Sequence, residues 1–484
     1  MLHLPVLRGG RPYRSLEVRR LTDLRTGAAI AELSQANPAL IAKDLAAATA
    51  AGARRALRAV GVRELLAICR RAAHLFATAD LPVGGDGELQ SPEAYVRQLS
   101  ATCGLPETLC RFNLEKVRGV LDGMETVLAG LTRGLDLTVL DTGLGTEDGR
   151  SLSYVGQADA LGAILPSNSP GVHTLWLPAL ALGVPVALKP GREEPWTPYR
   201  VCQAFLAAGL PGEALGFYPS DHAGAAEILQ RCGRSLLFGD AATVRPWQGD
   251  PRVEIHGPGW SKVVFGEDEA PQWERHLDLL ATSIAENGGR SCLNASGVWL
   301  PRPAAPGAPR GRELAAALAR RLAAIEALPL DHPEARLAAF SRPQTAHQIS
   351  DLIDRRLQTP GAVDLTAEVR GHGRVVEVGG CTFLLPTLVW CEDPVHPLAN
   401  TELLFPFAAV VEVPRAELPA RLGPTLVCTA LTADPGFRRE LLDSPWIDRL
   451  NLGPVPTSRL SWDQPHEGNL FDHLYRRRAV QACG

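Results

Sequence analysis

The chain has 484 residues, of which 45% are hydrophobic and 21% charged, and its formal net charge is −4. This composition is typical of a globular enzyme with a large core, and the lack of a basic excess argues against nucleic acid as a partner. The most apolar stretch, residues 175–188, contains two prolines and a glycine. We therefore expect no membrane span, and without an apolar export segment near residue 1 we expect a cytoplasmic protein.

The N-terminal third has apolar residues at helical spacing, which predicts helices over residues 37–57, 61–77 and 107–131. Glycine and proline predict a loop over residues 81–92. The pattern then changes, and residues 135–144 and 150–164 are predicted to be extended ribbons joined by the turn-rich segment 145–149.

From Leu161 onward, short apolar strands alternate with amphipathic helices. The predicted strands are 161–166, 184–190, 214–219, 235–239, 252–257 and 261–266, with helices over 170–183, 197–209 and 222–233. Such alternation predicts a doubly wound parallel sheet, which binds ligands at the carboxyl ends of its strands. A second α/β segment follows the proline-rich loop 300–313 and begins with a predicted helix over 313–328.

The ten cysteines include no CxxC pair, and the twelve histidines form no HxxxH or HxH cluster. We therefore expect reduced thiols and no metal site. One cysteine differs from the others in its surroundings: Cys292 lies in "ENGGRSCLNASG", between a glycine pair and small polar residues. Small neighbours leave room for a molecule to approach the sulfur, so Cys292 is a candidate nucleophile.

Four segments, taken in order, resemble the aldehyde dehydrogenase superfamily. "LGAILPSNSPGVHTLWLPALALGVPVALKPG" is similar to that family's strand, Pro-x-Asn-x-Pro turn, helix and strand ending in Lys-Pro. "GGRSC" resembles its Gly-Gln-x-Cys motif, and "NTELLFPFAAVVEV" resembles its Glu-x-Phe-Gly-Pro segment. The resemblance implies an α/β fold in three parts: a Rossmann-type cofactor domain (1–134 and 158–266), an α/β catalytic domain (267–452) and a β-ribbon oligomerisation element (135–157 and 453–484).

The resemblance also implies an activity, the NAD- or NADP-dependent oxidation of a small-molecule aldehyde by a homodimer or homotetramer. Cys292 would form a covalent thiohemiacetal and then a thioester, with the Asn168 amide and the Cys292 backbone N–H stabilising the developing negative charge on oxygen. The cofactor-binding residues that the resemblance implies are Lys189 for the adenosine ribose, Glu402 for the nicotinamide ribose, Pro166 and Gly239.

Two segments depart from the family pattern at the cofactor. In "FGDAATVRPW", Gly239 is present but a second glycine and a serine are missing, and Asp240 adds negative charge near the expected pyrophosphate. The Lys-Pro motif continues into "GREEPW", where Glu193 or Glu194 would suit a ribose 2′-hydroxyl and Arg192 a 2′-phosphate. The choice between NAD and NADP stays open.

A third departure concerns the base that activates water. In "VEIHGPGWSKVVF", ungapped alignment places Ile255 where hydrolytic members have a glutamate, whereas one gap brings Glu254 there. A shift of one residue along a strand reverses the side chain's face, so Glu254 is the candidate general base only with that gap. Glu286 is a weaker candidate. The Gly-Pro-Gly run is reminiscent of CoA-acylating members, so CoA is an alternative co-substrate.

Two further functions compete with this interpretation. One is a thiol hydrolase or acyltransferase that pairs Cys292 with a histidine such as His256; the other is a non-catalytic scaffold that retains the fold. The aldehyde is not identified by any motif, although Trp176 or Trp462 is a candidate for lining a substrate tunnel.

Overall fold

The computed structural model describes residues 1–84, 87–303 and 310–481. The chain forms two compact units. The first unit comprises residues 1–102, 110–257 and 461–484, and the second comprises residues 103–109 and 258–460. The architecture is α/β in both, which confirms the predicted fold class, while the division into cofactor and catalytic domains remains a prediction.

The first unit is built on a seven-stranded sheet of order β14-β13-β10-β11-β12-β2-β3. Its parallel part runs from β14 to β12, and the antiparallel β2 and β3 extend one edge. The strands are β2 (Val6–Arg8), β3 (Arg11–Tyr13), β10 (Leu161–Ile164), β11 (Val186–Lys189), β12 (Leu215–Phe217), β13 (Arg234–Phe238) and β14 (Val253–His256). The chain proceeds from β10 to one side and later returns to its other side with β13, so the sheet has a topological switch at β10.

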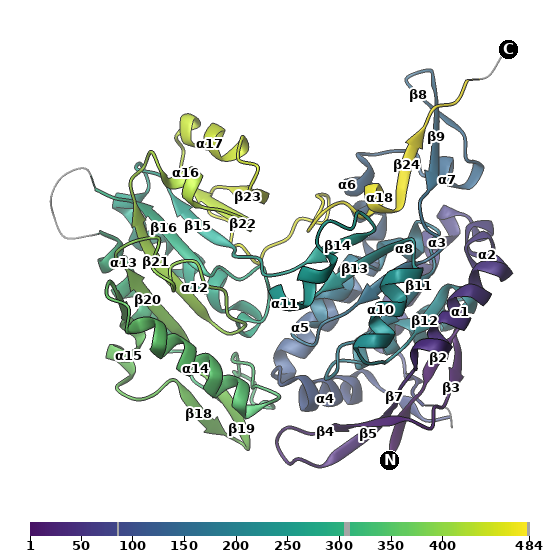
Figure 1. Ribbon diagram of the computed structural model, residues 1–484, viewed down its shortest axis with the longest axis horizontal. Helices are drawn as coiled ribbons and strands as arrows, with labels where there is room; N and C mark the ends of the chain where they lie inside the picture. The colour runs from purple at the N-terminus through teal and green to yellow at the C-terminus, as the bar shows by residue number, and fades with distance from the viewer. Residues whose placement is uncertain (85–86, 304–309, 482–484) are drawn as a thin grey trace. The chain divides into compact units, whose positions relative to one another are not determined.

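Helices cover both faces of this sheet (Figure 1). On one face, α1 (Pro38–Ala51) and α10 (His222–Arg231) lie side by side and pack on Ile164 and Leu237. The other helices of this unit and its boundary are α2 (Ala53–Val60), α3 (Val62–Thr78), α4 (Pro92–Cys103), α5 (Glu107–Asp122), α6 (Met124–Thr132), α8 (Pro178–Ala181), α9 (Trp196–Ala207), α11 (Ala241–Val244) and α18 (Leu470–Leu474). The predicted helix 37–57 is divided at Gly52, whose φ of 72° ends α1 in the left-handed region.

Helix 170–183 also differs from its prediction. It is a 3-10 helix, η1 (Pro170–Leu175), followed by the short α8. Pro178 explains the break, because proline donates no backbone hydrogen bond and its ring clashes with the preceding turn of a helix.

The sequence did not predict the strands before α1. Residues 2–34 form β1 (Leu2–Leu4), β4 (Val18–Thr22) and β5 (Ala29–Ser34), in a sheet of order β1-β5-β4, in addition to β2 and β3. Two short strands, β6 (Leu81–Pro82) and β7 (Leu89–Gln90), pair within the segment predicted as a loop, of which residues 85–86 lie outside the described part.

A separate three-stranded ribbon has the order β24-β9-β8, with β8 (Gly145–Glu147), β9 (Arg150–Gly156) and β24 (Tyr475–Arg478). The β8–β9 turn consists of Asp148 and Gly149, both with positive φ, as expected for a two-residue hairpin. Figure 1 shows the C-terminal strand beside β9, although the two are distant in sequence. The prediction of a ribbon over residues 135–144 was wrong, because Thr138–Thr142 forms the helix α7.

The second unit contains another seven-stranded sheet, of order β17-β20-β21-β16-β15-β22-β23, in which only β17 is antiparallel to its neighbour. The strands are β15 (Lys262–Phe265), β16 (Gly297–Pro301), β17 (Ala362–Asp364), β20 (Thr387–Cys391), β21 (Phe407–Val413), β22 (Thr425–Leu431) and β23 (Ile447–Leu452). A hairpin of β18 (Val375–Val378) and β19 (Cys381–Leu384) lies apart from it.

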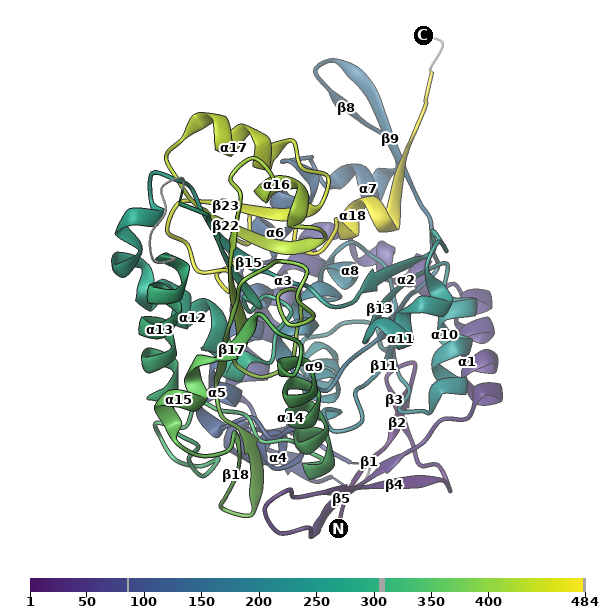
Figure 2. The ribbon, with the colours of Figure 1, turned by 60° about the vertical axis from the view of Figure 1, so that its left-hand side comes forward.

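Helices cover both faces of the second sheet (Figure 2), and hydrophobic side chains form a layer on each face. One contains side chains of α12 (Leu277–Ala285), α13 (Arg310–Ala323) and α15 (Leu365–Arg370). The other contains side chains of α14 (Pro343–Leu357), α16 (Leu418–Arg421) and α17 (Pro435–Leu442). The proline-rich loop lies partly outside the described residues. Within the described part of the chain, no helix has the length and apolar character needed to cross a membrane.

Candidate functional site

Cys292 lies in the loop between η5 (Glu286–Gly289) and β16 of the second unit. Of the nine cysteines that the structure describes, it is the one whose side chain is not buried. The others lie in the cores, and burial raises the pKa of thiols such as Cys69, Cys202 and Cys428 to about 12. Cys483 lies outside the described residues. Among the cysteines that the structure describes, Cys292 is therefore the one whose thiol a reagent or substrate can reach.

The glycine pair before Cys292 shapes a turn. Asn287, Gly288 and Gly289 have φ values of 53°, 67° and 67°, a left-handed run that glycine adopts without strain. A Cβ on Gly289 would overlap the Pro406 backbone nitrogen. The expected reason for these glycines was room around the sulfur; the structure shows instead that they serve the turn and its contact with residues 405–406.

The loop of Cys292 is held by residues 259–261, which precede β15. Ser261 donates from its hydroxyl to the Cys292 carbonyl at 2.7 Å. A Cβ on Gly259 would overlap that same carbonyl oxygen, so only glycine fits there. The Gly-Pro-Gly run that the sequence associates with CoA-acylating enzymes thus has a structural role in positioning Cys292.

Glu402 is held by the same segment. Its carboxylate accepts a hydrogen bond from the Trp260 backbone N–H at 2.5 Å, and Trp260 has a positive φ of 44°. Residues 259–261 therefore connect two predicted site residues, Cys292 and Glu402, within one unit. Sequence reasoning did not identify Trp260 or Ser261, because their role depends on contacts with residues far away in the chain.

Lys262, the first residue of β15, is buried next to this segment. Its amino group donates to the Trp260 carbonyl at 2.7 Å and to the Thr425 hydroxyl at 3.2 Å. Burial lowers the pKa of Lys262 to about 8. Lys262 thus binds the backbone carbonyl of Trp260, while Glu402 binds the backbone N–H of the same residue, so Lys262 is a support for the site.

In the first unit, Asn168 and Pro166 lie in the loop between β10 and η1, and both are half-buried. The loop is tied to the one after β11, because Ser167 accepts a hydrogen bond from the Glu193 N–H at 3.1 Å. A Cβ on Gly191 would overlap the Pro166 carbonyl oxygen. The two loops that carry the Pro-x-Asn-x-Pro and Lys-Pro motifs therefore meet at one edge of the sheet.

Lys189 ends β11 at this carboxyl edge, beside Ile164 of β10. Burial and the positive charges of Arg19 and Arg192 together lower the pKa of its amino group to about 8, although Glu193 and Asp221 raise it. Among the residues that the structure describes, no group accepts a hydrogen bond from this amine or forms an ion pair with it. A half-buried donor at the carboxyl edge of a doubly wound sheet, on the strand next to the switch at β10, suits the hydroxyls of a nucleotide ribose.

The predicted phosphate turn follows β13. The Gly239 N–H donates to the His256 carbonyl at 3.2 Å. A Cβ on Gly239 would lie 2.7 Å from the Thr243 methyl group, so the glycine allows a close approach of α11. Asp240 caps that helix by accepting from the Thr243 N–H at 2.8 Å, a bond that lowers the pKa of the carboxyl group. The aspartate carboxylate is thus engaged by its own helix.

Glu194 is buried and serves the protein interior. It pairs with the His173 ring at 2.8 Å and caps α9 by accepting from the Thr197 N–H at 3.0 Å. The suggestion that Glu194 binds a ribose hydroxyl was therefore wrong. Glu193, which is half-buried, and the exposed Arg192 remain at the surface of the loop.

Glu254 projects from β14 on the face opposite Ile255. Ile255 packs with the α1 and α10 layer. Glu254 instead lines a pocket of about 40 Å³ in the first unit, which we call the carboxylate pocket. Burial raises the pKa of Glu254, and the charge of Glu467 raises it further although His256 lowers it. Of the two residues that the alignment left open, Glu254 is the one that faces a cavity.

The carboxylate pocket is lined by Val127, Leu131, Thr174, Leu175, Pro178, Leu236, Glu254, His256, Trp462, Gln464, His466, Glu467 and Leu470. His256 stacks on Phe238 with ring centroids 4.4 Å apart, and its Nδ1 lies 2.7 Å from Glu467. The Glu467 carboxylate can only accept, so the Nδ1–H of His256 donates to it. In a neutral ring the other nitrogen, Nε2, is then an acceptor, and it lies 3.5 Å from Glu254. His256 is therefore partnered by carboxylates of its own unit, which does not favour the thiol hydrolase alternative.

The two tryptophans suggested for a substrate tunnel have different surroundings. Trp176 is fully buried and donates from its ring to His173 at 3.0 Å, so it belongs to the core and that suggestion was wrong. Trp462 lines the carboxylate pocket. Glu286, the weaker candidate base, begins η5, and its backbone carbonyl accepts from the Asn294 side chain at 3.0 Å. No group of three metal-binding side chains occurs within the described residues.

Comparison with known proteins found similarity in part of the sequence and in the fold. No family model matches the sequence. A curated relative, 2-hydroxymuconic semialdehyde dehydrogenase of Pseudomonas sp. (strain CF600), is 26% identical over 160 residues, which are 30% of this chain and 31% of the relative. The match thus spans about a third of that protein's length.

Solved structures match over almost the whole chain. PnpE from Pseudomonas sp. WBC-3 has a TM-score of 0.77 at 16% identity, covering 99% of this chain and 97% of PnpE. A mutant of the P. syringae indole-3-acetaldehyde dehydrogenase AldA, in complex with NAD+ and IAA, has a TM-score of 0.76 at 16% identity, covering 99% and 96%. A putative aldehyde dehydrogenase from Burkholderia cenocepacia has a TM-score of 0.74 at 17% identity, covering 99% and 97%. The chain therefore has the aldehyde dehydrogenase fold.

Proposed function

We propose that the protein is an NAD(P)-dependent aldehyde dehydrogenase that oxidises a small aldehyde to a carboxylic acid through a thioester on Cys292. The observation that carries this proposal is the position of Cys292, which has the only thiol among the described residues that is not buried. Residues 259–261 hold its loop and also bind Glu402. The same short segment therefore positions a nucleophile, Cys292, and a carboxylate, Glu402, in a chain with this fold.

The reaction begins at sulfur. The Cys292 thiolate attacks the aldehyde carbon, a C–S bond forms, and the carbonyl π electrons move to oxygen. We assign the Asn168 side-chain amide and the Cys292 backbone N–H as donors to that oxygen. Donors that are already oriented stabilise such a charge by about 3–4 kcal/mol each, as judged from the loss when one is removed.

Several residues of the chain suit a nicotinamide dinucleotide. Lys189 offers a half-buried amine at the carboxyl end of β11, Gly239 follows β13 at the same edge of the sheet, and the half-buried Pro166 lies in the loop after β10. The Glu402 carboxylate has further acceptor capacity for ribose hydroxyls. When bound, the nicotinamide ring would accept the hydride that leaves the thiohemiacetal carbon. Arg192 and Glu193 are the remaining candidates for distinguishing NADP from NAD.

The thioester is then hydrolysed. We assign Glu254 as the general base that takes a proton from water, so that hydroxide adds to the thioester carbon and the Cys292 thiolate leaves with the C–S electrons. Its position in a pocket, rather than in the core where Ile255 lies, supports this role.

We further propose that the protein is a homodimer or homotetramer bridged by the ribbon of β8, β9 and β24. In this ribbon β8 and β24 are edge strands, and edge strands expose backbone groups that can pair with another chain.

Product analysis tests the proposed function. With a panel of small aldehydes and either cofactor, we expect one carboxylate for each NADH or NADPH formed, and no requirement for CoA. A thioester product that forms only with CoA would indicate the acylating reaction. Failure of the folded protein to bind either cofactor in calorimetry would indicate a scaffold, and esterase activity without cofactor would indicate a thiol hydrolase.

Replacing Lys189 by methionine should weaken cofactor binding by about tenfold, because a charged donor to a ribose hydroxyl contributes roughly 1.5–3 kcal/mol. The KM for the aldehyde should stay unchanged. Since the amine of the unmodified protein loses its proton near pH 8, its cofactor affinity should also fall between pH 7 and 9, and this fall should be absent in Lys189→Met. Titration calorimetry at both pH values measures the effect, with the exposed Lys43→Met as the matched control. Equal weakening in both variants would contradict the assignment.

A further inference from the structure

A cavity much larger than the carboxylate pocket lies in the first unit, at the edge of the sheet opposite the proposed cofactor site. Its lining includes Ala160, Pro185 and Gly233, which directly precede β10, β11 and β13. The cavity is therefore at the amino ends of the parallel strands, whereas Lys189 ends β11 and Asn168 follows β10 at the carboxyl ends. Its volume is about 1360 Å³, which is ample for a small molecule.

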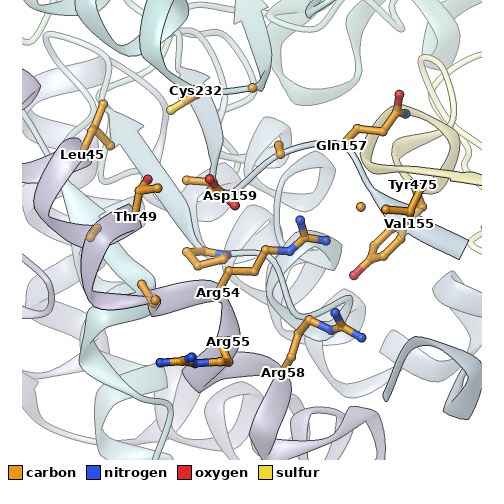
Figure 3. Close-up of a pocket in the computed structure, with 18 of the residues that line it drawn as sticks. Leu45, Thr49, Arg54, Arg55, Arg58, Val155, Gln157, Asp159, Cys232 and Tyr475 are labelled. Atoms are coloured by element: carbon orange, nitrogen blue, oxygen red, sulfur yellow. The ribbon is translucent and has the colours of Figure 1, made fainter. Parts of the chain in front are cut away.

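Five arginines line this cavity, which we call the arginine cleft: Arg54, Arg55 and Arg58 from α2, Arg231 from α10 and Arg478 from β24. Figure 3 shows the three from α2. The lining contains two carboxylates, Asp141 and Asp159, which leaves an excess of three positive charges. Like charges gathered around a cavity repel one another unless anions lie between them.

Arg54 is the central cation. Its guanidinium lies over the Tyr475 ring, 5.6 Å from the centroid, and Figure 3 shows it extending toward Val155 and Gln157. A Cβ on Gly156 would overlap Arg54 Nη2, so the guanidinium packs directly on that backbone. Its Nε is buried and has no hydrogen-bond partner, and no described residue forms an ion pair with it.

Arg58 is one helical turn further along α2 and so projects on the same side as Arg54. It donates from one terminal nitrogen to the Leu140 carbonyl, while its buried Nε has no partner among the described residues. Gly52 and Ala53, which begin α2, also line the cleft, and no described side chain caps this helix N-terminus. A helix N-terminus carries partial positive charge, which adds to that of the arginines.

The carboxylates do not neutralise this charge. Asp141 accepts from the Val62 N–H at 3.1 Å and so caps α3, and Asp159 is exposed. Among the described residues, neither aspartate forms an ion pair with a lining arginine. Arg231 is neutralised by Glu227, and Arg478 donates to the Ser153 hydroxyl at 3.2 Å. Within the part of the chain that the structure describes, the three arginines of α2 therefore remain without a carboxylate.

We propose that the arginine cleft binds a small polyanion, a molecule with at least two phosphoryl or carboxyl groups. Guanidinium groups present paired donors that match both kinds of oxyanion, and their attraction is strongest in partly buried sites. The aromatic face of Tyr475 and the Gly156 backbone hold Arg54 in place before the ligand arrives, which reduces the entropy lost on binding. This site is independent of the proposed dehydrogenase reaction.

Isothermal titration of the full-length protein with pyrophosphate and with citrate, at low ionic strength, tests the proposal. We expect at least one of them to bind with one molecule per chain, and the identity of the tighter ligand distinguishes phosphoryl from carboxyl chemistry. The double variant Arg54→Gln/Arg58→Gln should weaken binding by at least about tenfold, since each lost charged hydrogen bond accounts for roughly that factor. Added salt should weaken it further in the unmodified protein.

The matched control is Arg320→Gln, an exposed arginine of α13 in the second unit, which should bind as the unmodified protein does. Because Arg54 is packed, Arg478→Gln provides a second test at an exposed position and should weaken binding without a change in melting temperature. Absence of binding by both probes, or equal affinity in the double variant, would overturn the proposal. A changed oligomeric mass in the double variant, without binding in the unmodified protein, would instead identify the cleft as a subunit interface and also overturn it.

Discussion

Replacing Cys292 by alanine is expected to reduce aldehyde-dependent formation of NADH or NADPH by at least about a thousandfold, because the covalent route then has no nucleophile. The protein should still fold and bind cofactor, since the Cys292 side chain is not buried and alanine keeps the backbone carbonyl that accepts from Ser261. Stopped-flow absorbance at about 340 nm, where a reduced nicotinamide absorbs, would measure the loss.

Alkylation provides an independent measurement on the unmodified protein. At pH 8, iodoacetamide should modify Cys292 first and abolish activity in proportion, because burial hinders access to the other described thiols and raises the pKa of several of them to about 12. Mass spectrometry of the labelled peptides identifies the site.

Cys69→Ala is the matched control for Cys292→Ala. Cys69 is buried in α3 of the first unit, where alanine suits the helix, so this variant should retain turnover. If Cys292→Ala stays active, or if labelling elsewhere causes the inactivation, the thioester mechanism is excluded.

The alternating pattern after Leu161 predicted the five parallel strands of the first sheet, because buried parallel strands separated by amphipathic helices leave a local signal in the sequence. The strand predicted over 261–266 also forms, but as β15 of the second sheet. The strands before α1 left a weaker signal. Each of them is short, and pairings such as β12 with β2 join residues about two hundred positions apart in the chain. Residues 138–142 form a helix in spite of their strand-like composition, which shows that tertiary context outweighs local preference over short segments.

Residues of the candidate site could be predicted from the sequence only where they lie in a recognisable motif. Cys292, Asn168, Lys189 and Glu402 lie in recognisable motifs, but the contacts that support them do not follow from sequence order. Glu402 meets Trp260 across 142 positions, and the arginine cleft joins α2 to Tyr475. Such contacts depend on the arrangement of the folded chain, and no local periodicity encodes them.

The role of Glu254 depends on a choice that the sequence left open, because only the backbone determines which face of β14 each side chain occupies. Ile255 packs in the core of the α1 and α10 layer, and Glu254 faces the carboxylate pocket. Because Glu254 and not Ile255 faces the pocket, Glu254 is the candidate base for hydrolysis. Replacing Glu254 tests that assignment.

Replacing Glu254 by glutamine should therefore slow thioester hydrolysis by about a hundredfold or more, the usual contribution of a general base. Oxidation should be spared, so that a burst of about one reduced cofactor per subunit precedes a slow steady state. Hydroxylamine, which attacks thioesters without a base, should restore turnover. Rapid-mixing kinetics with and without hydroxylamine measures both effects.

The pH dependence provides a further readout. Only the ionised carboxylate accepts a proton, and burial raises the pKa of Glu254. Steady-state activity of the unmodified protein should therefore fall, as the pH is lowered, at a higher pH than an ordinary glutamate would give, and this fall should be absent in Glu254→Gln. A raised folded-state pKa also means that ionised Glu254 destabilises the fold as the pH rises through that pKa, so the glutamine variant should be at least as stable at pH 7. Loss of turnover would then not reflect unfolding.

Ile255→Val is the matched control on the other face of the strand. It should lower the free energy of unfolding by about 0.5–1.5 kcal/mol and leave the rate of hydrolysis unchanged. If Glu254→Gln shows no burst and retains the full steady-state rate, Glu254 is not the base. Because its neighbours His256 and Glu467 line the same pocket, a burst that appears in His256→Gln but not in Glu254→Gln would transfer the role to the histidine.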